Sequence, residues 1–499
     1  MKAHAIGLLA CSIFSVQAQQ HNMVPDLPNF TLYDKPGFDT PGALSNAWAD
    51  YDNDGDLDLV VSFKSGEIRL YQNNLGELTS IGESLGLPIS GIDGRSIAWG
   101  DWNNDGFPDL FIGTFQRPYH QYNLFYENEN GNRFVEKAAK VGVLLPNTTA
   151  RQGSWIDYDN DGDLDFYQAQ RMGGNRMFRN DDGHFTDTSK MVGLYDPRRS
   201  VGVCWFDADQ NGFLDAFVAN QSGDRDGYYQ NKDGAFTDVA HQYAMDHPLR
   251  PLNEGGVGCA VGDFNNDGHF DIFVATYGED LLYQNDGKGG FTEVAAQMGI
   301  TGNHHHVSAQ WGDVNNDGLL DLYVVGFRGN DIRARDYLYL NTGNGFVDAL
   351  PDNVAKSDSD HGIQLVDFDL DGDLDLSFTH SDNTAGHQKL FINQLNSAGL
   401  SLLVAPVNAV SGSLIPGAEV RIFDKDNHIL ASRLVDTGGG YNAQNSISTH
   451  FGFPNITEVS VQVTFLTETG RSSVLVPNIN LSQWQGKVLR VSRMGVIQQ

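Results

Sequence analysis

Short apolar runs, each placed directly after an acidic loop, recur along most of this 499-residue chain. Four of the runs read LDLVVSF, PDLFIGTF, FDIFVATY and LDLYVVGF, and they are rich in β-branched and aromatic residues. Apolar or alternating runs of this length and composition are typical of β-strands. After the N-terminal segment, no run approaches the roughly 18 consecutive apolar residues of a membrane-spanning helix. We therefore expect a chain of strands with no membrane span.

The acidic loop is a nine-residue motif, D-x-[DN]-x-[DN]-G-x-x-D, which occurs seven times. Calcium takes about six to eight oxygen ligands, and carboxylates or amides at positions 1, 3, 5 and 9 supply them together with the carbonyl of position 7. Glycine at position 6 permits the sharp turn. An EF-hand needs glutamate at position 12, but no copy has one. We expect up to seven structural calcium ions in loops that join strand to strand.

The expected calcium ligands follow from the seven loop starts, which lie 50 to 56 residues apart. They are Asp50, Asp52, Asp54, Asp56, Asp58, Asp101, Asn103, Asp105, Phe107, Asp109, Asp157, Asp159, Asp161, Asp163, Asp165, Asp207, Asp209, Asn211, Phe213, Asp215, Asp263, Asn265, Asp267, His269, Asp271, Asp313, Asn315, Asp317, Leu319, Asp321, Asp367, Asp369, Asp371, Asp373 and Asp375. Positions 1, 3, 5 and 9 hold 24 of the 64 acidic residues, so seven divalent ions would change the net charge from −32 to −18. The acidity is explained mainly by these loops, and it argues against nucleic-acid binding.

A second element follows each loop and its strand. It consists of an aromatic residue, any residue and Asn, then a glycine turn and in most copies Phe-Thr or Phe-Val; it is led by Tyr71, Tyr126, Phe178, Tyr229, Tyr283, Tyr339 and Phe391. Each repeat therefore predicts four strands, and four-stranded repeats with a period of roughly 40 to 56 residues form propeller blades. The seventh repeat lacks the last strand, whereas Phe30-Thr31 supplies one before the first repeat. We predict an all-β fold with a seven-bladed β-propeller at residues 29–396, closed by that early strand.

These repeats resemble the FG-GAP or VCBS repeats of integrin α-subunit propellers. Beyond the propeller, the sequences GAEVR, GGGYNAQ and THFG, at 417–421, 438–444 and 449–452, resemble landmarks of the ASPIC/UnbV domain. Together the two halves are similar to the cartilage acidic protein family. The resemblance implies a calcium-stabilised propeller with a C-terminal domain, and it implies little chemistry because most members have no assigned reaction.

The two ends of the chain have different compositions. Met1-Lys2, the apolar run AIGLLACSIFSV and Val16-Gln17-Ala18 predict a signal peptide at residues 1–18, cleaved after Ala18, and hence a secreted or periplasmic protein. We expect this protein to be a monomer. Residues 399–495 contain alternating runs such as EVRIF and EVSVQVTFL, which predict a small β-sandwich-like domain. Its DTGGGYNAQ segment is interpreted as a structural turn or a binding loop, and His450 as a structural histidine.

Two cysteines remain after the signal peptide. Cys204 and Cys259 lie three and four residues before the first loop aspartates of neighbouring blades. Because an offset of one residue points strand side chains to opposite faces of a sheet, we expect two buried free thiols.

The face opposite the calcium loops is the expected ligand face, because the variable connections of a propeller meet there near its channel. Arginine and histidine are frequent on it: Arg95, Arg117, Arg151, Arg171, Arg198, Arg199, His304, His306, Arg328, His361 and His380. Guanidinium groups bind carboxylate or sulfate bidentately, so we hypothesise a site for an anionic ligand such as an acidic polysaccharide. The alternatives are that these arginines pair with nearby acidic residues, and that the histidines hold a transition metal.

We interpret the chain as a secreted calcium-binding propeller that acts as an extracellular binding or adhesion module. The sequence contains no G-x-S-x-G elbow, Walker loop or H-E-x-x-H motif, and the absence of these motifs argues against an enzyme. A lyase or hydrolase acting on a polysaccharide or a small metabolite is the alternative, because a site built from distant loops leaves no linear motif. A third hypothesis is a cell-surface protein partner, and the fold does not decide between these functions.

Overall fold

The computed structural model describes residues 27–497, except 36–37, 39, 116–121, 147, 248–249, 303–304, 328–334, 355–359, 381–387 and 396–398. The expected signal peptide and its cleavage position lie outside the described residues. Nearly all regular structure in the described part is strand, and its helices are α1 (Ala138–Val141), α2 (Ser189–Val192) and the 3-10 turn η1 (Leu481–Gln483). Each of these helices is far too short to span a bilayer.

Seven sheets make up the first part of the described chain. Each has four antiparallel strands, and the second sheet has a fifth, parallel strand that comes from residues 443–444. From inner to outer edge, the first four are β2 (Ala43–Ala49), β3 (Asp58–Phe63), β4 (Ile68–Gln72), β5 (Thr79–Ser80); β6 (Gly94–Gly100), β7 (Asp109–Thr114), β8 (Leu124–Asn128), β9 (Phe134–Glu136); β10 (Ala150–Ile156), β11 (Asp165–Gln170), β12 (Arg176–Asp181), β13 (His184–Asp187); and β14 (Ser200–Phe206), β15 (Asp215–Asn220), β16 (Gly227–Lys232), β17 (Ala235–Asp238). The remaining three are β18 (Gly256–Gly262), β19 (Asp271–Thr276), β20 (Leu281–Asn285), β21 (Phe291–Glu293); β22 (His306–Gly312), β23 (Asp321–Gly326), β24 (Tyr337–Asn341), β25 (Phe346–Asp348); and β26 (Asp360–Val366), β27 (Asp375–His380), β28 (Gln388–Asn393), β1 (Phe30–Leu32).

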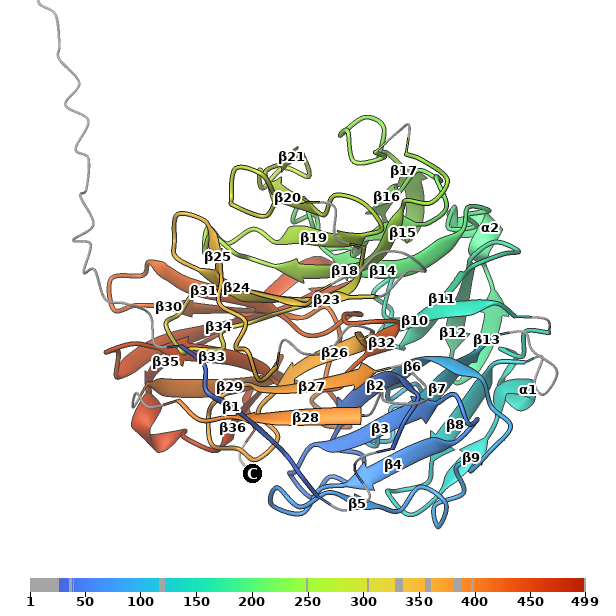
Figure 1. The fold of residues 1–499 in the computed structure, drawn as a ribbon, viewed down its shortest axis with the longest axis horizontal. Helices are drawn as coiled ribbons and strands as arrows, with labels where there is room; N and C mark the ends of the chain where they lie inside the picture. The colour runs from blue at the N-terminus through green and yellow to red at the C-terminus, as the bar shows by residue number, and fades with distance from the viewer. Residues whose placement is uncertain are drawn as a thin grey trace, which may run out of the picture.

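The inner strands of consecutive sheets pack side by side and close a ring, since β26 of the last sheet also packs against β2 of the first. Figure 1 shows the sheets fanning out around β32 (Ala443–Gln444) at the centre. Fully buried tryptophans, among them Trp99 and Trp155, fill the spaces between neighbouring sheets. The expectation of an all-β propeller is confirmed, and we number the blades one to seven by their acidic loops.

The seventh blade takes its outer strand from the other end of the chain. β1 pairs antiparallel with β28, with Phe30 opposite Asn393 and Leu32 opposite Phe391. Phe30 is only 2% exposed and belongs to the core around blades six and seven. The early strand therefore closes the ring in the way the sequence predicts.

The prediction of two free thiols is wrong, because Cys204 and Cys259 form a disulfide. Cys204 lies on β14 and Cys259 on β18, the inner strands of adjacent blades, and their Cα atoms are 6.1 Å apart. Two cysteines whose side chains lie on opposite faces of a single sheet could not meet. Adjacent blades pack face to face, however, so a side chain on the near face of one blade meets the side chain on the facing side of the next.

The asparagine of each aromatic-x-Asn element fastens its blade to the preceding blade. Asn231 Nδ2 donates to the carbonyl of Tyr158 in the loop of blade three at 2.9 Å and to a carbonyl in its own loop at 3.1 Å, while its backbone N–H donates to Asp215 Oδ1 at 2.7 Å. Asn73 makes the same contact back to Phe368 of blade seven, which closes the circuit. The pattern recurs at Asn128, Asn180, Asn285, Asn341 and Asn393.

We expect Asn231→Ala to lower the free energy of unfolding by about 2 to 6 kcal/mol, because it leaves two buried carbonyl groups without a donor at about 1 to 3 kcal/mol each. Urea unfolding would measure this change. Asn132→Ala is the matched control, since Asn132 is exposed and, among the described residues, its side chain bonds only to the nearby carbonyl of Asn130. Equal unfolding midpoints for the two variants would contradict the role of Asn231.

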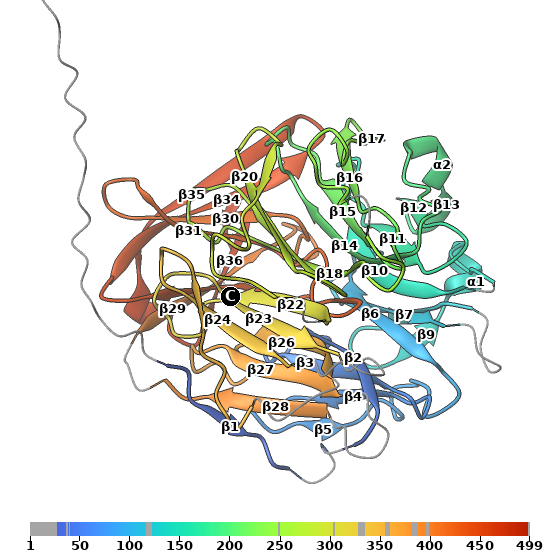
Figure 2. The same cartoon turned by 45° about the horizontal axis from the view of Figure 1, so that its top comes forward.

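The C-terminal domain consists of two sheets that enclose their own apolar core. Its strands are β29 (Leu400–Pro406), β33 (Thr449–Phe453), β36 (Val488–Ser492) and β37 (Gly495–Val496) in one sheet, and β30 (Glu419–Phe423), β31 (Ile429–Leu434), β34 (Glu458–Thr467) and β35 (Gly470–Asn480) in the other. Figure 2 shows its red strands β34 and β35 on one side of the propeller. Its strand β32 leaves the domain and pairs parallel with β6 of blade two.

Candidate cation loops and channel-mouth site

All seven acidic loops adopt the same local structure between the inner strand and the second strand of a blade. Residue 4 of each loop has a left-handed conformation, for example Asn53 with φ 60°, and the glycine at position 6 also has a positive φ. The N–H of that glycine donates to the position-1 carboxylate, as from Gly55 to Asp50 Oδ2 at 3.1 Å. The position-1 side chain is thereby held toward the middle of its loop.

Carboxylates converge in three of the loops. Oxygens of Asp50, Asp52 and Asp58 lie within 4.8 Å of one another, and the same is true of the triads Asp157, Asp159, Asp165 and Asp367, Asp369, Asp371. Within the described structure, one buried oxygen on several of these aspartates has no hydrogen-bond partner: Oδ1 of Asp52, Asp157, Asp159, Asp367 and Asp369. A divalent cation is the group that these convergent oxygens fit.

The electrostatics of the loops also fit a cation. Burial and the neighbouring carboxylates Asp161 and Asp159 raise the pKa of Asp157 to about 8. Burial, with a smaller effect from Asp317, raises the pKa of Asp313 to about 7. Crowded carboxylates that are removed from water disfavour their charged forms, and a bound divalent ion reverses this effect.

The residue at position 7 of each acidic loop is expected to contribute its carbonyl oxygen to the ion. Where this residue is an aspartate, its carboxylate bonds outside the loop. Asp56 Oδ2 accepts from the N–H of Leu75 at 2.8 Å, and Asp163 Oδ2 accepts from the N–H of Asp182 at 3.0 Å. These bonds tie the loop to the turn between the third and fourth strands. The side chain is therefore engaged away from the loop centre, and the carbonyl ligand stays a prediction.

The C-terminal domain packs against the face of the propeller that carries the acidic loops. This packing could not be predicted from the sequence. Groups of the domain contact six of the seven loops: Ser413 on Asp101, the carbonyl of Thr467 on Asn160, Arg471 on Asp207, Arg421 on the carbonyl of Gly268, Gly452 on Asn316, and His450 on the carbonyl of Gly372. Several of these contacts are made to position 1 or position 6 of a loop. The domain therefore touches the groups that shape the cation sites.

His450 is the histidine that was expected to be structural. Its Nε2 lies 3.0 Å from the carbonyl oxygen of Gly372, and burial lowers its pKa to about 4. The neutral imidazole therefore joins the C-terminal domain to the loop of blade seven.

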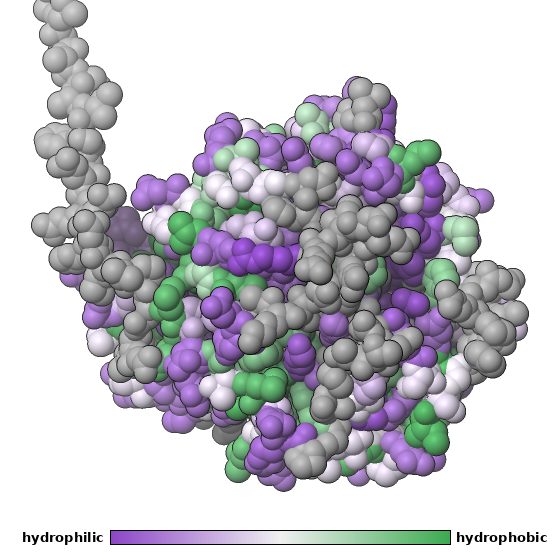
Figure 3. Space-filling view, in the orientation of Figure 1, coloured by the Kyte–Doolittle hydropathy of each residue, from purple (hydrophilic) through white to green (hydrophobic). Residues whose placement is uncertain are grey.

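The inner strands start on the face of the propeller that lies opposite the acidic loops. Arg95, Arg151 and His361 are the second residues of three of these strands and therefore lie near that face. Figure 3 shows the side of the molecule that faces the viewer in Figure 1, on which hydrophilic residues predominate. The candidate residues Arg117, His304 and Arg328 lie outside the described residues.

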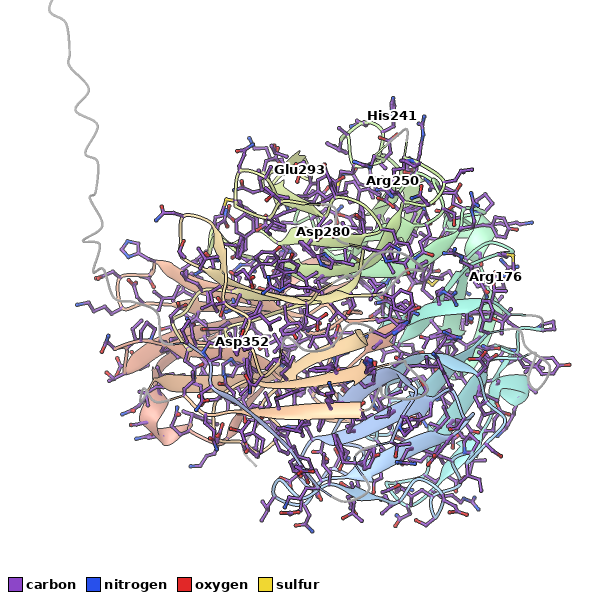
Figure 4. All side chains as sticks on the ribbon, viewed as in Figure 1. Arg176, His241, Arg250, Asp280, Glu293 and Asp352 are labelled. Carbon is purple, nitrogen blue, oxygen red and sulfur yellow. A yellow bond between two sulfur atoms is a disulfide. The ribbon has the colours of Figure 1, made fainter. Side chains whose placement is uncertain are left out.

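Several candidate ligand residues are instead paired within the protein. Arg199 Nε lies 2.8 Å from Asp224 Oδ2, and Arg198 contacts Asp196 and Asp238 at 2.8 and 2.7 Å. His306 is fully buried and bonds to Asp280, which is labelled in Figure 4. His380 is also buried, at the end of β27. For Arg198 and Arg199, the alternative of pairing with acidic residues is the one the geometry favours.

Three other arginines come together at the channel mouth. Arg95 and Arg151 both lie over the ring of Phe115, at 5.7 and 4.9 Å from its centre. Arg171 Nη2 donates to Ser222 Oγ at 3.1 Å, whereas its buried Nη1 has no partner among the described residues. Burial lowers the pKa of Arg151, and the positive charges of Arg95 and Arg171 lower it further. These guanidinium groups are therefore close enough to repel one another.

Carboxylates do not neutralise this cluster fully. Arg95 Nε lies 3.1 Å from Asp93 Oδ1, but neither Arg151 nor Arg171 has an ion pair within the described part of the chain. Burial also lowers the pKa of Arg171. Half-buried, unpaired guanidinium groups of this kind are the expected chemistry of a carboxylate or sulfate site.

Comparison with known proteins gives the repeats a family. A family model described as an FG-GAP-like repeat matches residues 50–112, 157–218, 207–274 and 263–324. The chain is 24% identical to cartilage acidic protein 1 of Xenopus tropicalis over 462 residues, which are 84% of this chain and 69% of that protein. The chain is an FG-GAP repeat protein related to cartilage acidic protein 1.

This FG-GAP repeat protein is also 27% identical to cartilage acidic protein 1 of Mus musculus and of Homo sapiens over 261 residues. These alignments cover 50% of the present chain and 39% and 38% of the two relatives.

Solved structures also align with the chain. BBS1N in complex with ARL6DN has a TM-score of 0.46 at 11% identity, covering 75% of this chain and 99% of that one. An Agrocybe aegerita protein that recognises non-reducing terminal N-acetylglucosamine has a TM-score of 0.40 at 17% identity, covering 74% of this chain and 94% of that one.

Proposed function

We propose that this protein is a secreted calcium-binding propeller that acts as an extracellular binding module for an anionic ligand, for which an acidic polysaccharide is the best candidate. The observation that carries the proposal is the cluster of Arg95, Arg151 and Arg171, in which two guanidinium groups lack a carboxylate partner among the described residues. Their position at the channel mouth, on the face away from the acidic loops, leaves the calcium sites to stabilise the scaffold.

Calcium is supported by the ligand chemistry of the loops. The converging carboxylates and the buried oxygens without hydrogen-bond partners supply hard oxygen ligands. Magnesium is less suitable, because it needs a strict octahedron and keeps several of its waters. In the proposed protein, each ion neutralises a carboxylate cluster and holds two strands of a blade together.

An extracellular location is supported by the disulfide between Cys204 and Cys259. Disulfides persist in oxidising compartments such as the periplasm and the extracellular space, and they are rare in the cytosol. The signal peptide expected at residues 1–18 has the same implication.

The proposal predicts that Arg151→Gln combined with Arg171→Gln weakens binding of an acidic polysaccharide about 100-fold. Hydrogen bonds to charged groups contribute about 1.5 to 3 kcal/mol each, so removing two guanidinium groups has at least this effect. The measurement is electrophoresis of calcium-loaded protein through gels that contain either a polyuronate or a sulfated polysaccharide. The two gels distinguish a carboxylate ligand from a sulfate ligand.

The matched control is Arg133→Gln combined with Arg179→Gln, which removes the same charge from exposed arginines paired with Glu129 and Asp181. This variant is expected to keep the mobility shift of the unchanged protein. Equal shifts for the two double variants would contradict the arginine site. The chain length of each polysaccharide is checked after incubation. Shortened polymer would show that the protein is an enzyme and would contradict the binding-module proposal.

A further inference from the structure

A loop of the C-terminal domain fills the channel of the propeller. Residues 436–446 leave β31 on the acidic-loop side and run between the inner strands. The backbone of this loop contacts several blades: Ala443 and Gln444 pair with Ile97 and Ala98, and the N–H of Gly440 donates to the carbonyl of Ala309 at 3.3 Å. The channel is therefore occupied by the protein's own chain.

The three consecutive glycines of this loop are explained by the narrow space. A Cβ atom on Gly438 would lie 2.0 Å from Gln152 Nε2, and one on Gly440, whose φ is 62°, would lie 2.6 Å from the carbonyl oxygen of Ile363. Any larger residue would collide with the inner strands. The glycine run, whose sequence is interpreted as a structural turn or a binding loop, is what lets the loop enter the channel.

Side-chain hydrogen bonds fix how far the loop reaches. Gln444 accepts from the N–H of Trp155 at 2.7 Å and donates to its carbonyl at 2.9 Å. Asn442 Nδ2 donates to the carbonyl of Arg95 at 3.1 Å, on the second residue of β6. The loop tip therefore reaches the level of the arginine cluster on the far side of the ring.

Tyr441 stands at this tip. Its carbonyl accepts from Ser45 Oγ at 3.2 Å, and its ring meets that of His361 edge-to-face at 5.0 Å. The ring belongs to the same apolar cluster as Val201 and Val257, the equivalent inner-strand residues of blades four and five. Tyr441 is only 8% exposed, so its position is set by packing on all sides.

Tyr441 lies at the level of the arginine cluster. Asn442 beside it bonds to the carbonyl of Arg95, and the ring of Tyr441 meets that of His361, which has the same place on β26 as Arg95 and Arg151 have on β6 and β10. The phenol also opposes the lowering of the pKa of Arg151 and Arg171 that burial causes. Tyr277 is itself held in place, since its ring stacks on His305 at 3.7 Å between centres. Arg151 and Arg171 of blade three, Tyr277 of blade five and Tyr441 of the C-terminal domain therefore lie near one another at the channel mouth.

We infer that the anion site is completed by Tyr441, whose phenolic O–H donates a hydrogen bond to the oxyanion that Arg151 and Arg171 bind. This inference rests on the proposed function and extends it, because the ligand would contact both domains. The ligand group is a carboxylate or a sulfate, since each offers two or more oxygens to bidentate guanidinium groups and a further oxygen to the phenol. The C-terminal domain then has a direct role in binding.

The test is Tyr441→Phe in the full chain, which removes the hydroxyl group and keeps the ring that packs against His361. Binding of glucuronate and of inorganic sulfate is measured by titration calorimetry in calcium buffer. Loss of one hydrogen bond to a charged group is expected to weaken binding by about 10-fold or more, with the melting temperature unchanged. Tyr195→Phe is the control, because its hydroxyl bonds to the carbonyl of Gly173 at the surface.

The outcomes separate this inference from the proposed function. If the Arg151 and Arg171 variant loses binding while Tyr441→Phe binds like the control, the role of Tyr441 is wrong and the arginine site stands. If the unchanged protein binds neither probe, both ideas are wrong. Weakened binding by Tyr441→Phe, with a melting temperature equal to that of Tyr195→Phe, supports the composite site.

Discussion

Removing calcium is expected to lower the free energy of unfolding by about 10 kcal/mol. A ligand that binds only the folded protein stabilises it by RT ln(1 + [L]/Kd), or about 1.4 kcal/mol per loop when the ion is present at ten times its Kd. Extracellular calcium sites have Kd values of about 10⁻⁴ to 10⁻³ M, so about 10 mM calcium meets this condition. Seven loops give the stated total. Urea unfolding of calcium-loaded and metal-free protein would measure the difference.

Magnesium at the same concentration is the control for ionic strength and charge. Because the loops offer more oxygens than magnesium uses, it should restore only a small part of the lost stability. Identical unfolding midpoints with and without calcium would show that the acidic loops hold their structure without an ion.

The metal-free protein should also lose stability as the pH rises. Burial raises the pKa of Asp50 to about 6 and of Asp157 to about 8, and neighbouring aspartates add to both shifts. A carboxyl group whose pKa is higher in the folded state stabilises the fold below its unfolded pKa near 3.8, and this contribution disappears as the pH rises through the folded value. Metal-free protein should therefore unfold at lower urea at pH 8 than at pH 5, while calcium should remove most of this difference.

Deleting residues 27–33 from the full chain should lower the free energy of unfolding by at least about 5 kcal/mol. The deletion removes β1 and the buried ring of Phe30, and loss of a buried phenylalanine side chain alone costs about 3 to 5 kcal/mol. It also removes Tyr33, which packs edge-on against Phe368 of blade seven. Thermal unfolding followed by circular dichroism would measure the loss.

The exposed edge of β28 has a second consequence in the deletion variant. An unpaired strand edge is a template for pairing with another chain, so size-exclusion chromatography should show oligomers. Leu32→Ser is the control, because Leu32 is 48% exposed and the substitution keeps the backbone pairing with Phe391. A monomeric deletion variant that melts with the control would contradict the closure.

The repeat architecture was predictable because its determinants are local. The loop spacing, the apolar run after each loop and the aromatic-x-Asn element each fix one part of a blade, and together they give the all-β propeller. The asparagines were visible as a pattern, but their bond to the preceding blade was not, because a carbonyl acceptor such as that of Tyr158 leaves no trace in sequence.

The features that could not be predicted from the sequence depend on contacts between different blades or between the two domains. The one-residue offset of Cys204 and Cys259 decides which way their side chains face only for strands of a single sheet, whereas the disulfide joins two sheets that face each other. The arginines of the ligand face could be located by counting back from each loop, but only the structure separates Arg199, which pairs with Asp224, from Arg151, which has no such partner among the described residues. Tyr441 comes from a different domain, so repeat counting could not reach it.

The C-terminal domain covers the loops unequally, so calcium ions bound in them as proposed would have different lifetimes. Asp313 and Asn315 of blade six are only 1% and 4% exposed beneath the backbone of Gly452, whereas Asp54 of blade one is open to solvent. An ion in blade one can exchange with the medium directly. An ion in blade six would be covered by the C-terminal domain and should exchange more slowly, so a brief passage through calcium-poor surroundings should empty the first site before the sixth.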